Sequence, residues 1–313
     1  MNNLRKKPKV IAIVGPTASG KTNISIQIAK ILNGEIISAD SRLVYKDFNV
    51  GTAKPTEEEM AGIPHHLVSI QSPSETYTVG KYKKEAEEKI KEILNKNKVP
   101  IVVGGTGFYV KALLEGLNIP DIDPDEDFRQ EMENLVKNNG KEALYKKLQE
   151  SDPEMAKKLM PNDSFRIIRA LEVQKISGQK MSESQTISES EYDVLYCGLN
   201  AEAREFLYER INSRVLIMLE QGLVKEVETL IKKCGRTVSL LKTLGYKEIC
   251  EYFDGIYTIE ETIAKIQQNT RKFAKRQLTW FRANKKINWF FVDKMNSDEI
   301  IKEIVEKYYE HNF

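Results

Sequence analysis

The residues best suited to chemistry stand together near the start of the chain, in the segment GPTASGKT at residues 15–22. This segment fits the phosphate-binding pattern G-x-x-x-x-G-K-[ST], and it follows an apolar run at residues 10–14 that is typical of a buried parallel strand. In such a loop, backbone N–H groups face phosphate oxygens at a helix N-terminus, Lys21 reaches the outer phosphate, and the Thr22 hydroxyl suits Mg²⁺. The motif predicts a bound polyphosphate but does not name the reaction.

A carboxylate is expected close to that loop. Residues 35–40, EIISAD, predict a second strand whose polar end shares the ligand-binding edge of a parallel sheet, which places Asp40 and Ser41 near the phosphates. Asp40 could hold the metal or act as a base on a second substrate, and a turn or helix cap is the alternative. Thr106, between glycines after a strand predicted at residues 100–103, could contact a ligand or simply occupy a turn.

A strongly basic segment at residues 269–286 contrasts with a whole-chain net charge of +2. It contains many lysines and arginines and no acidic residue, so it suits a polyanion, and nucleic acid is the first candidate. A solvated cationic helix face is the alternative. On a helix the segment would have two faces, with Phe273, Gln277, Trp280 and Phe281 on one and Arg271, Lys275 and Arg282 on the other.

The pattern of elements predicts an α/β fold, with a mostly parallel sheet of the phosphate-loop type flanked by helices and with an all-helical insertion. The predicted core comprises residues 1–117 and 194–313, and the insertion comprises residues 118–193 and closes with a polar, mobile loop at 177–191. Further strands are predicted at residues 66–70, 99–103, 194–199 and 288–293, and core helices at residues 79–98, 202–233, 258–284 and 297–309.

Composition describes an ordinary globular protein, with 313 residues, 41% hydrophobic and 30% charged. No apolar run is long enough to span a membrane, and the N-terminal residues do not form a secretory signal, so a cytoplasmic protein without a membrane partner is expected. Cys197, Cys234 and Cys250 are too far apart for a C-x-x-C pair, which argues against a disulfide framework and a cysteine metal site.

Several blocks in this order resemble the bacterial tRNA dimethylallyltransferases, also called tRNA isopentenyltransferases: GPTASGKT, SADSRLVYKDFNVGTAKP, IPHHLV, VGGTGFY, FRIIRALEV, RINSRVLIMLEQGLVKEV, LGYKE and TRKFAKRQLTWFR. The resemblance extends over residues 10–292 and is far more specific than a phosphate loop alone. Enzymes of that family move a dimethylallyl group from dimethylallyl diphosphate to the exocyclic amine of the adenosine just 3′ of the tRNA anticodon, and they release diphosphate with Mg²⁺ present.

The resemblance implies roles for particular residues. Asp40 would act as the base on the adenine amine, Thr106 would hold the adenine edge or the diphosphate, and Thr22 would contact Mg²⁺. The diphosphate would be bound by Gly15, Thr17, Ala18, Ser19, Gly20, Lys21, Thr22 and Arg214. The tRNA would be bound by Asp40, Ser41, Arg42, Leu43, Thr106, Phe165, Arg166, Arg169, Lys242, Gly245, Tyr246, Lys247, Arg271, Lys275, Arg276 and Arg282.

One departure from the family concerns residues 42 and 43, where Arg42-Leu43 replaces the usual Met-Gln. A base-edge hydrogen bond from position 43 is therefore in doubt, while Arg42 could contact a phosphate. Without the resemblance, single helical arginines such as Arg166, Arg169 and Arg214 would be expected on the surface or in salt bridges.

Three other functions fit parts of the sequence. A small-molecule kinase would share the loop and the sheet, but it predicts an acidic metal ligand and leaves the basic helix unexplained. An adenylate isopentenyltransferase acting on free AMP or ATP would not need the large insertion. A nucleic-acid-binding module without catalysis would make the phosphate loop redundant. The main prediction is a monomeric enzyme whose insertion grips the anticodon stem-loop and receives a flipped adenosine.

Overall fold

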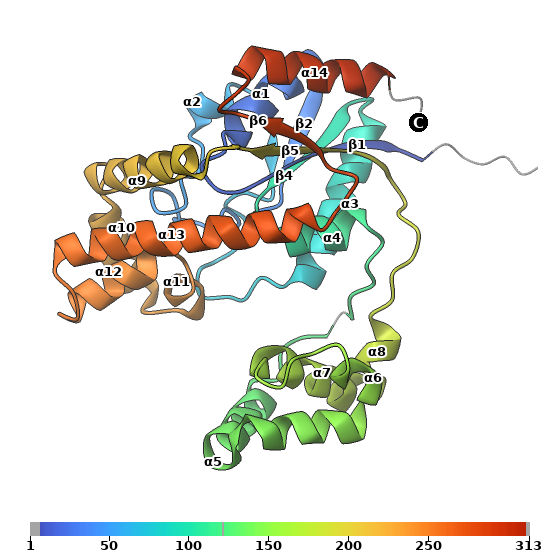
Figure 1. The fold of residues 1–313 in the computed structure, drawn as a ribbon, viewed down its shortest axis with the longest axis vertical. Coiled ribbons are helices and arrows are strands. Elements are labelled where there is room, and N and C mark those ends of the chain that lie inside the picture. Colours follow the sequence, from blue (N-terminus) through green and yellow to red (C-terminus); the bar gives the residue numbers. More distant parts are fainter. Residues whose placement is uncertain (1–6, 121, 311–313) are drawn as a thin grey trace, which may run out of the picture. The chain divides into compact units, whose positions relative to one another are not determined.

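The computed structural model describes residues 7–120 and 122–310, which form two compact units (Figure 1). The larger, here called the core unit, contains the chain as far as Thr78, Tyr82–Leu114 and the chain from Glu191 onward. The smaller, here called the helical unit, contains Val79–Lys81 and Glu115–Ser190. In the described parts of both units, no helix is both long and apolar enough to cross a membrane.

Among the described residues, the core unit has one six-stranded sheet with the strands β1 (Lys9–Val14), β2 (Gly34–Ser38), β3 (His65–His66), β4 (Val99–Gly104), β5 (Asp193–Asn200) and β6 (Asn288–Phe291). Every strand pair is parallel, and the order across the sheet is β3-β2-β4-β1-β5-β6. The apolar residues of β1 are fully buried because the strand is central and covered on both faces. This sheet confirms the predicted fold class.

The helices of the core unit are α1 (Lys21–Ile31), α2 (Glu57–Met60), α3 (Val79–Asn95), α4 (Gly107–Leu114), α9 (Arg204–Glu220), α10 (Leu223–Cys234), α11 (Val238–Leu241), α12 (Tyr246–Phe253), α13 (Ile259–Arg282) and α14 (Ser297–Glu310), and only the first three residues of α3 fall in the helical unit. On one face of the sheet, Ile28 of α1 and Ile304 of α14 join Ile13 and Leu199 in a single apolar cluster. Figure 1 shows α1 and α14 together on that side, while α4 and α13 lie on the other. The sheet is thus covered on both faces, as parallel connections require.

Two of the elements predicted for the core unit differ in the structure. The strand predicted at residues 66–70 is wrong beyond His66, because Leu67 and Ser69 have left-handed backbone angles, with φ of 61° and 55°, that cannot continue an extended strand. The helical pattern predicted at residues 202–233 is two helices, since Gly222 between them has φ 93°. The other core strands lie where the apolar runs predicted them, with ends shifted by one or two residues.

The helical unit consists of α5 (Glu126–Ser151), α6 (Pro153–Ala156), α7 (Ser164–Ser177) and α8 (Met181–Ser184). The last of these lies within the polar stretch that was expected to be a loop. Gly140, with φ 80° and ψ 168°, interrupts α5, so the segment packs as two helices around one apolar cluster. That cluster contains Met132 from the first part, Leu144 from the second and Ile167 from α7.

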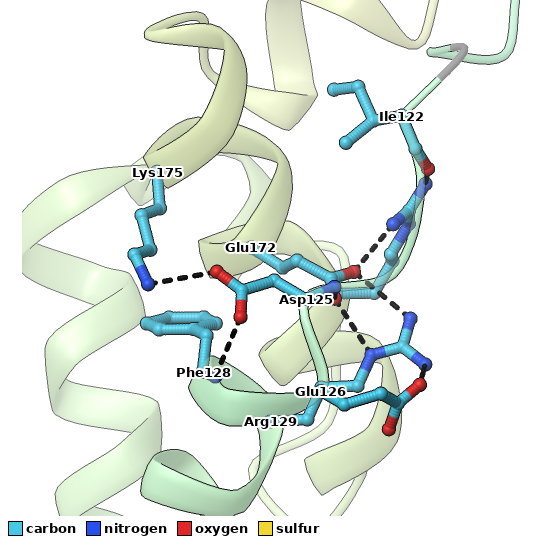
Figure 2. A network of polar contacts seen from close by, with 8 residues as sticks. Ile122, Asp125, Glu126, Phe128, Arg129, Glu172 and Lys175 are labelled. Carbon is cyan, nitrogen blue, oxygen red and sulfur yellow. Dashed lines mark hydrogen bonds and ion pairs between the residues drawn. The ribbon is translucent and has the colours of Figure 1, made fainter.

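A buried carboxylate joins α5 and α7 in the helical unit, as Figure 2 shows. Glu172 is fully buried and accepts hydrogen bonds from Arg129 Nε at 2.7 Å, from Arg169 and from the backbone N–H of Asp125 at 2.9 Å. Although burial raises it, the bonds from both arginines hold the pKa of Glu172 below its ordinary value. Arg169 also donates to the carbonyl of Ile122 at 2.9 Å, so its guanidinium has a structural task within this unit.

Candidate active site

The phosphate loop connects the end of β1 to the start of α1, and its backbone geometry depends on glycine at two positions. Gly15 has φ 143°, and a Cβ there would lie 2.2 Å from the carbonyl oxygen of Leu199 on β5. Gly20 precedes α1 with a left-handed φ of 89°. The Ser19 hydroxyl donates to the Pro16 carbonyl at 2.9 Å, which fixes the turn from inside the protein. The loop therefore presents its backbone at the N-terminus of α1, where an anion is favoured.

Lys21 is the cation of this loop. Its Nζ donates to the carbonyls of Gly15 at 3.0 Å and Pro16 at 2.6 Å. Burial lowers the pKa of Lys21 to about 8, with Asp40 opposing the shift and Arg214 adding to it. An incoming anion would supply the negative charge that this partly desolvated ammonium lacks.

Arg214, on α9, brings a second cation to the loop. Its Nη1 lies 3.5 Å from the hydroxyl of Thr17, and burial followed by repulsion from Arg210 lowers its pKa. Within the described ranges, neither Lys21 nor Arg214 forms an ion pair with a carboxylate. The structure thus brings together two cations that sequence spacing alone could not relate.

Asp40 and Thr106 follow the neighbouring strands β2 and β4. Asp40 thus lies at the sheet edge where parallel topology predicted it. The Asp40 carboxylate accepts the backbone N–H of Arg42 at 2.8 Å, so it does cap a turn, and its charge also acts on Lys21. The Thr106 hydroxyl accepts the backbone N–H of Ser41 at 3.0 Å, and the Thr106 N–H donates to the Ala39 carbonyl at 3.1 Å. The two segments are therefore held side by side by direct hydrogen bonds.

These groups surround a cavity of about 920 Å³ within the core unit. Its apolar wall includes Val215, Ile266 and Phe273, while Asp40 and the cations Lys21 and Arg214 line another part. A cavity of this size accommodates a small phosphorylated molecule with an apolar tail together with a nucleobase. The predicted site residues that line it are Thr17, Ala18, Gly20, Lys21, Thr22, Asp40, Ser41, Arg42, Leu43, Arg214, Lys242, Gly245 and Arg276.

Other predicted residues lie outside the lining. Gly15, Ser19 and Tyr246 are buried beneath it. Thr106 does not line the cavity itself, but it is hydrogen-bonded to Ser41, which does. Three predicted tRNA-binding residues of the core unit are exposed and lie away from the lining, namely Lys247, Lys275 and Arg282. Arg271 is half-buried, donates a hydrogen bond to Asn212 and lies over the ring of Tyr208.

The aromatic face predicted for α13 is only partly correct. Phe281 and Gln277 are buried, but Trp280 is 40% exposed, because its ring lies over the glycine turn at Gly107 near the surface. Of the cations predicted to face outward, Lys275 and Arg282 are exposed, whereas Arg271 is half-buried against Asn212. Arg276 is exposed and also lines the cavity. In the helical unit, Phe165 and Arg166 are exposed at the first turn of α7.

Sequence reasoning missed two polar residues at the site. Glu226 of α10 accepts three successive backbone N–H groups, from Asn49, Val50 and Gly51, and also the hydroxyl of Tyr246 at 2.6 Å. It thereby holds the loop from which Gly51 and its two successors line the cavity. No local signal indicates this pairing, because the partners are 177 to 175 residues apart.

The second missed residue is Gln277, which was assigned to the aromatic face of α13 without a role. Its amide hydrogen-bonds to Thr17 and to Gly105, and it lines the cavity. A polar residue on an otherwise apolar helix face was the one signal that could have indicated it.

Several known proteins are similar to this chain over most of its length. The profile of the family described as IPP transferase matches residues 43–284. A tRNA dimethylallyltransferase of Thermoanaerobacter sp. (strain X514) is 46% identical over 305 residues, which cover 96% of this chain and 97% of that relative. One from Bacillus anthracis is 45% identical over 305 residues, with 96% and 97% covered.

Two solved structures are also similar. The tRNA isopentenylpyrophosphate transferase of Bacillus halodurans is 43% identical with a TM-score of 0.71, over 97% of this chain and 98% of that one. The second is a eukaryotic dimethylallyltransferase that is described as acting on tRNA. It is 29% identical with a TM-score of 0.80, over 97% of this chain and 80% of that one.

Proposed function

The chain belongs to the IPP transferase family, and from this membership we propose that it transfers a dimethylallyl group from dimethylallyl diphosphate to the exocyclic amine of the adenosine just 3′ of the tRNA anticodon. The observation that carries the proposal is a single cavity in the core unit that is lined by the phosphate loop, by Asp40 and by an apolar wall. These three parts match a diphosphate leaving group, an amine to be deprotonated and an allylic chain.

At the donor end, the loop amides, Lys21 and Arg214 bind the diphosphate. As the bond between the allylic carbon and oxygen breaks, its electron pair leaves with the diphosphate, and both cations stabilise the growing negative charge. Because neither cation has a carboxylate partner among the described residues, both are free to respond to that charge. The apolar wall with Val215 and Phe273 excludes water from the allylic carbon.

At the acceptor end, Asp40 accepts a proton from the adenine amine while the new carbon–nitrogen bond forms. An aromatic amine is a poor nucleophile, so positioning and deprotonation during attack both contribute. Thr106 lies outside the cavity lining, so in this proposal it acts through Ser41 and positions the turn that carries Asp40.

Mg²⁺ fits this arrangement through Thr22, whose exposed side chain lies on the first turn of α1 and lines the cavity. Within the described ranges, no group of three His, Cys, Asp or Glu residues could hold a metal by itself. The ion would therefore be bound by the Thr22 hydroxyl together with oxygens of the diphosphate, and it would supply positive charge against the leaving group.

The tRNA is bound by cations of the core unit and, in this proposal, by the helical unit. Lys275, Arg276 and Arg282 on the outer face of α13 contact phosphates, and Lys242 lines the cavity through which a flipped adenosine would enter. The domain of residues 118–193 grips the anticodon stem-loop, with Phe165 and Arg166 as exposed contact residues. The proposal retains the monomeric state and the cytoplasmic location, which analytical ultracentrifugation and cell fractionation would check.

The direct test incubates the protein with Mg²⁺, radiolabelled dimethylallyl diphosphate and either tRNA or AMP. Label in tRNA, and no label in a transcript with guanosine 3′ of the anticodon, is the expected result. Label only in AMP would favour an adenylate isopentenyltransferase, and phosphate transfer from ATP would favour a kinase. Binding of tRNA without any transfer would leave only a nucleic-acid-binding module.

A further inference from the structure

Gln277 is a buried amide at the point where three segments of the core unit meet. Its side chain projects from α13 and is 6% exposed. Its Oε1 accepts the backbone N–H of Thr17 in the phosphate loop at 2.9 Å, and its Nε2 donates to the carbonyl of Gly105 at 3.0 Å. The partners are 260 and 172 residues away in sequence, so this contact exists only in the folded core.

The two bonds of Gln277 join the donor half of the cavity to the acceptor half. Thr17 belongs to the loop after β1, and Gly105 belongs to the turn after β4, the neighbouring strand. The residue after Gly105 is Thr106, whose hydroxyl accepts the N–H of Ser41. A continuous line of hydrogen bonds and adjacent residues therefore runs from the phosphate loop, through Gln277, to the turn that carries Asp40.

The fit around this amide is tight. A Cβ on Gly105 would lie 2.2 Å from Nε2 of Gln277, so any larger residue at position 105 would have to displace the amide. The amide is also oriented, because Thr17 supplies a donor and Gly105 an acceptor, and a reversed amide would face each with the wrong group. The packing and the polarity thus both select one position of the side chain.

We propose that Gln277 is a positioning residue, which holds the phosphate loop and the Thr106 turn at one separation so that the diphosphate and the acceptor base meet in register. This role rests on the proposed function, because the two substrates to be aligned are those of prenyl transfer. The two hydrogen bonds of Gln277 would order the loop for any anion that binds there. An ordered loop binds its anion without first losing conformational freedom, and loss of the bridge removes that advantage.

The test measures the Kd of inorganic pyrophosphate with Mg²⁺ by calorimetry. Gln277→Met keeps the length of the side chain and removes both hydrogen bonds, and we expect about tenfold weaker binding, the change expected from losing one or two neutral hydrogen bonds. Thr279→Ala, on the exposed side of the same helix, is the matched control and should bind as the parent does. Thermal unfolding of both variants reports folding.

A second variant makes the test independent of one substitution. Gly105→Ala should push the amide aside and weaken pyrophosphate binding, and it should add little to Gln277→Ala, because the displaced group is already absent. Additive effects, or a Kd within about twofold of the parent for Gln277→Met, would overturn the proposal. A lower melting temperature with unchanged Kd would assign Gln277 to stability alone, which also overturns it.

Kinetics separate this inference from the proposed function. If tRNA is prenylated, Gln277→Met should raise KM for dimethylallyl diphosphate and lower kcat while the Kd of tRNA stays unchanged. If the parent binds pyrophosphate in a Gln277-dependent manner but prenylates neither tRNA nor AMP, the proposed function fails and the positioning role stands. If the Gln277→Met variant prenylates tRNA with the KM and kcat of the parent, the proposed function stands and the positioning role fails.

Discussion

Two clusters of charged side chains, one in each unit, are built differently. In the helical unit, the carboxylate of Glu172 is matched by two guanidiniums and a backbone N–H, so the cluster is closed (Figure 2). In the core unit, Lys21 and Arg214 are half-buried and contact only carbonyl and hydroxyl oxygens, so the cluster is open. A closed cluster contributes to structure, whereas an open cluster of cations is suited to a ligand of opposite charge.

The pKa directions express the same difference. Hydrogen bonds hold the pKa of Glu172 below its ordinary value despite burial, so its charged form is favoured. Burial lowers the pKa of Lys21 and of Arg214, so their charged forms are disfavoured until an anion arrives. Changes in each cluster should therefore affect different measurements, stability in one and catalysis or binding in the other.

The largest effect is expected at Asp40, the carboxylate that lines the same cavity as the open cluster. Asp40→Asn should lower kcat by about 1,000-fold, because the loss of a positioned base removes that order of rate. The Kd of tRNA should stay close to that of the parent in a filter-binding assay. Asp47→Asn is the control, since Asp47 lies in the same loop but pairs with Lys233 at the surface. Equal rates for Asp40→Asn and the parent would remove Asp40 from the mechanism.

Next in size is the loss of the closed cluster. Glu172→Ala should lower the free energy of unfolding by about 3 kcal/mol, because the half-buried guanidiniums of Arg129 and Arg169 lose the fully buried carboxylate that pairs with them. Urea unfolding followed by circular dichroism measures this, and the Kd of pyrophosphate should not change. Glu154→Ala, which removes an exposed pair with Lys157, is the control. A stability equal to that of the parent would mean that the cluster in Figure 2 contributes nothing.

Acid should weaken the closed cluster in a defined direction. The folded pKa of Glu172 is below its unfolded value, so its stabilising contribution is present above the unfolded pKa and is lost as the pH falls through the folded pKa. The difference in stability between the parent and Glu172→Gln should therefore shrink in acid. A difference that stays constant down to acid unfolding would contradict this.

The open cluster should respond to alkali instead. Lys21 attracts the anion only when protonated, and its pKa is about 8, so affinity for pyrophosphate is full below that pH and falls above it. The fall should approach about tenfold per pH unit, as one linked proton requires. Lys21→Met supplies the control profile, which contains only the ligand's own protonation. Parallel profiles for the parent and the variant would exclude Lys21 as the titrating group.

The smallest effect concerns charges that are not buried at all. Lys275→Ala with Arg276→Ala should weaken tRNA binding by roughly tenfold and reduce the slope of log Kd against log salt by about 1.5, since each phosphate contact adds just under one unit. Lys302→Ala on α14, an exposed lysine elsewhere, is the control. An unchanged slope would make the outer face of α13 a merely solvated surface.

The sequence predicted the parts of this site that depend on local patterns. The loop motif, the apolar runs and parallel topology sufficed to bring Lys21 and Asp40 to one edge of the sheet. Such patterns could not relate residues far apart in sequence. The sequence therefore did not predict that Gln277 bonds the phosphate loop to the Gly105 turn, nor that Glu226 accepts three backbone N–H groups.

Two local expectations failed or became more complex for physical reasons. Leu67 and Ser69 adopt left-handed angles that apolar patterning does not encode, so the strand predicted there ends early. Arg169, implied by resemblance to contact tRNA, also forms the Glu172 cluster, and its role with tRNA stays a prediction. Which side chains pair depends on how the folded chain packs, and residue spacing in the sequence does not predict it.

The close approach of Gly15 to the Leu199 carbonyl has a consequence for how the enzyme is made. On the ribosome, β1 emerges early, yet its neighbour β5 and the helices that supply Arg214 and Gln277 are translated only after the whole helical unit. Until then, the backbone N–H and C=O groups along one edge of β1 have no strand partner, which exposes the nascent chain to misassociation. Chaperones that shield a half-made sheet should therefore matter more to its biogenesis than to its upkeep.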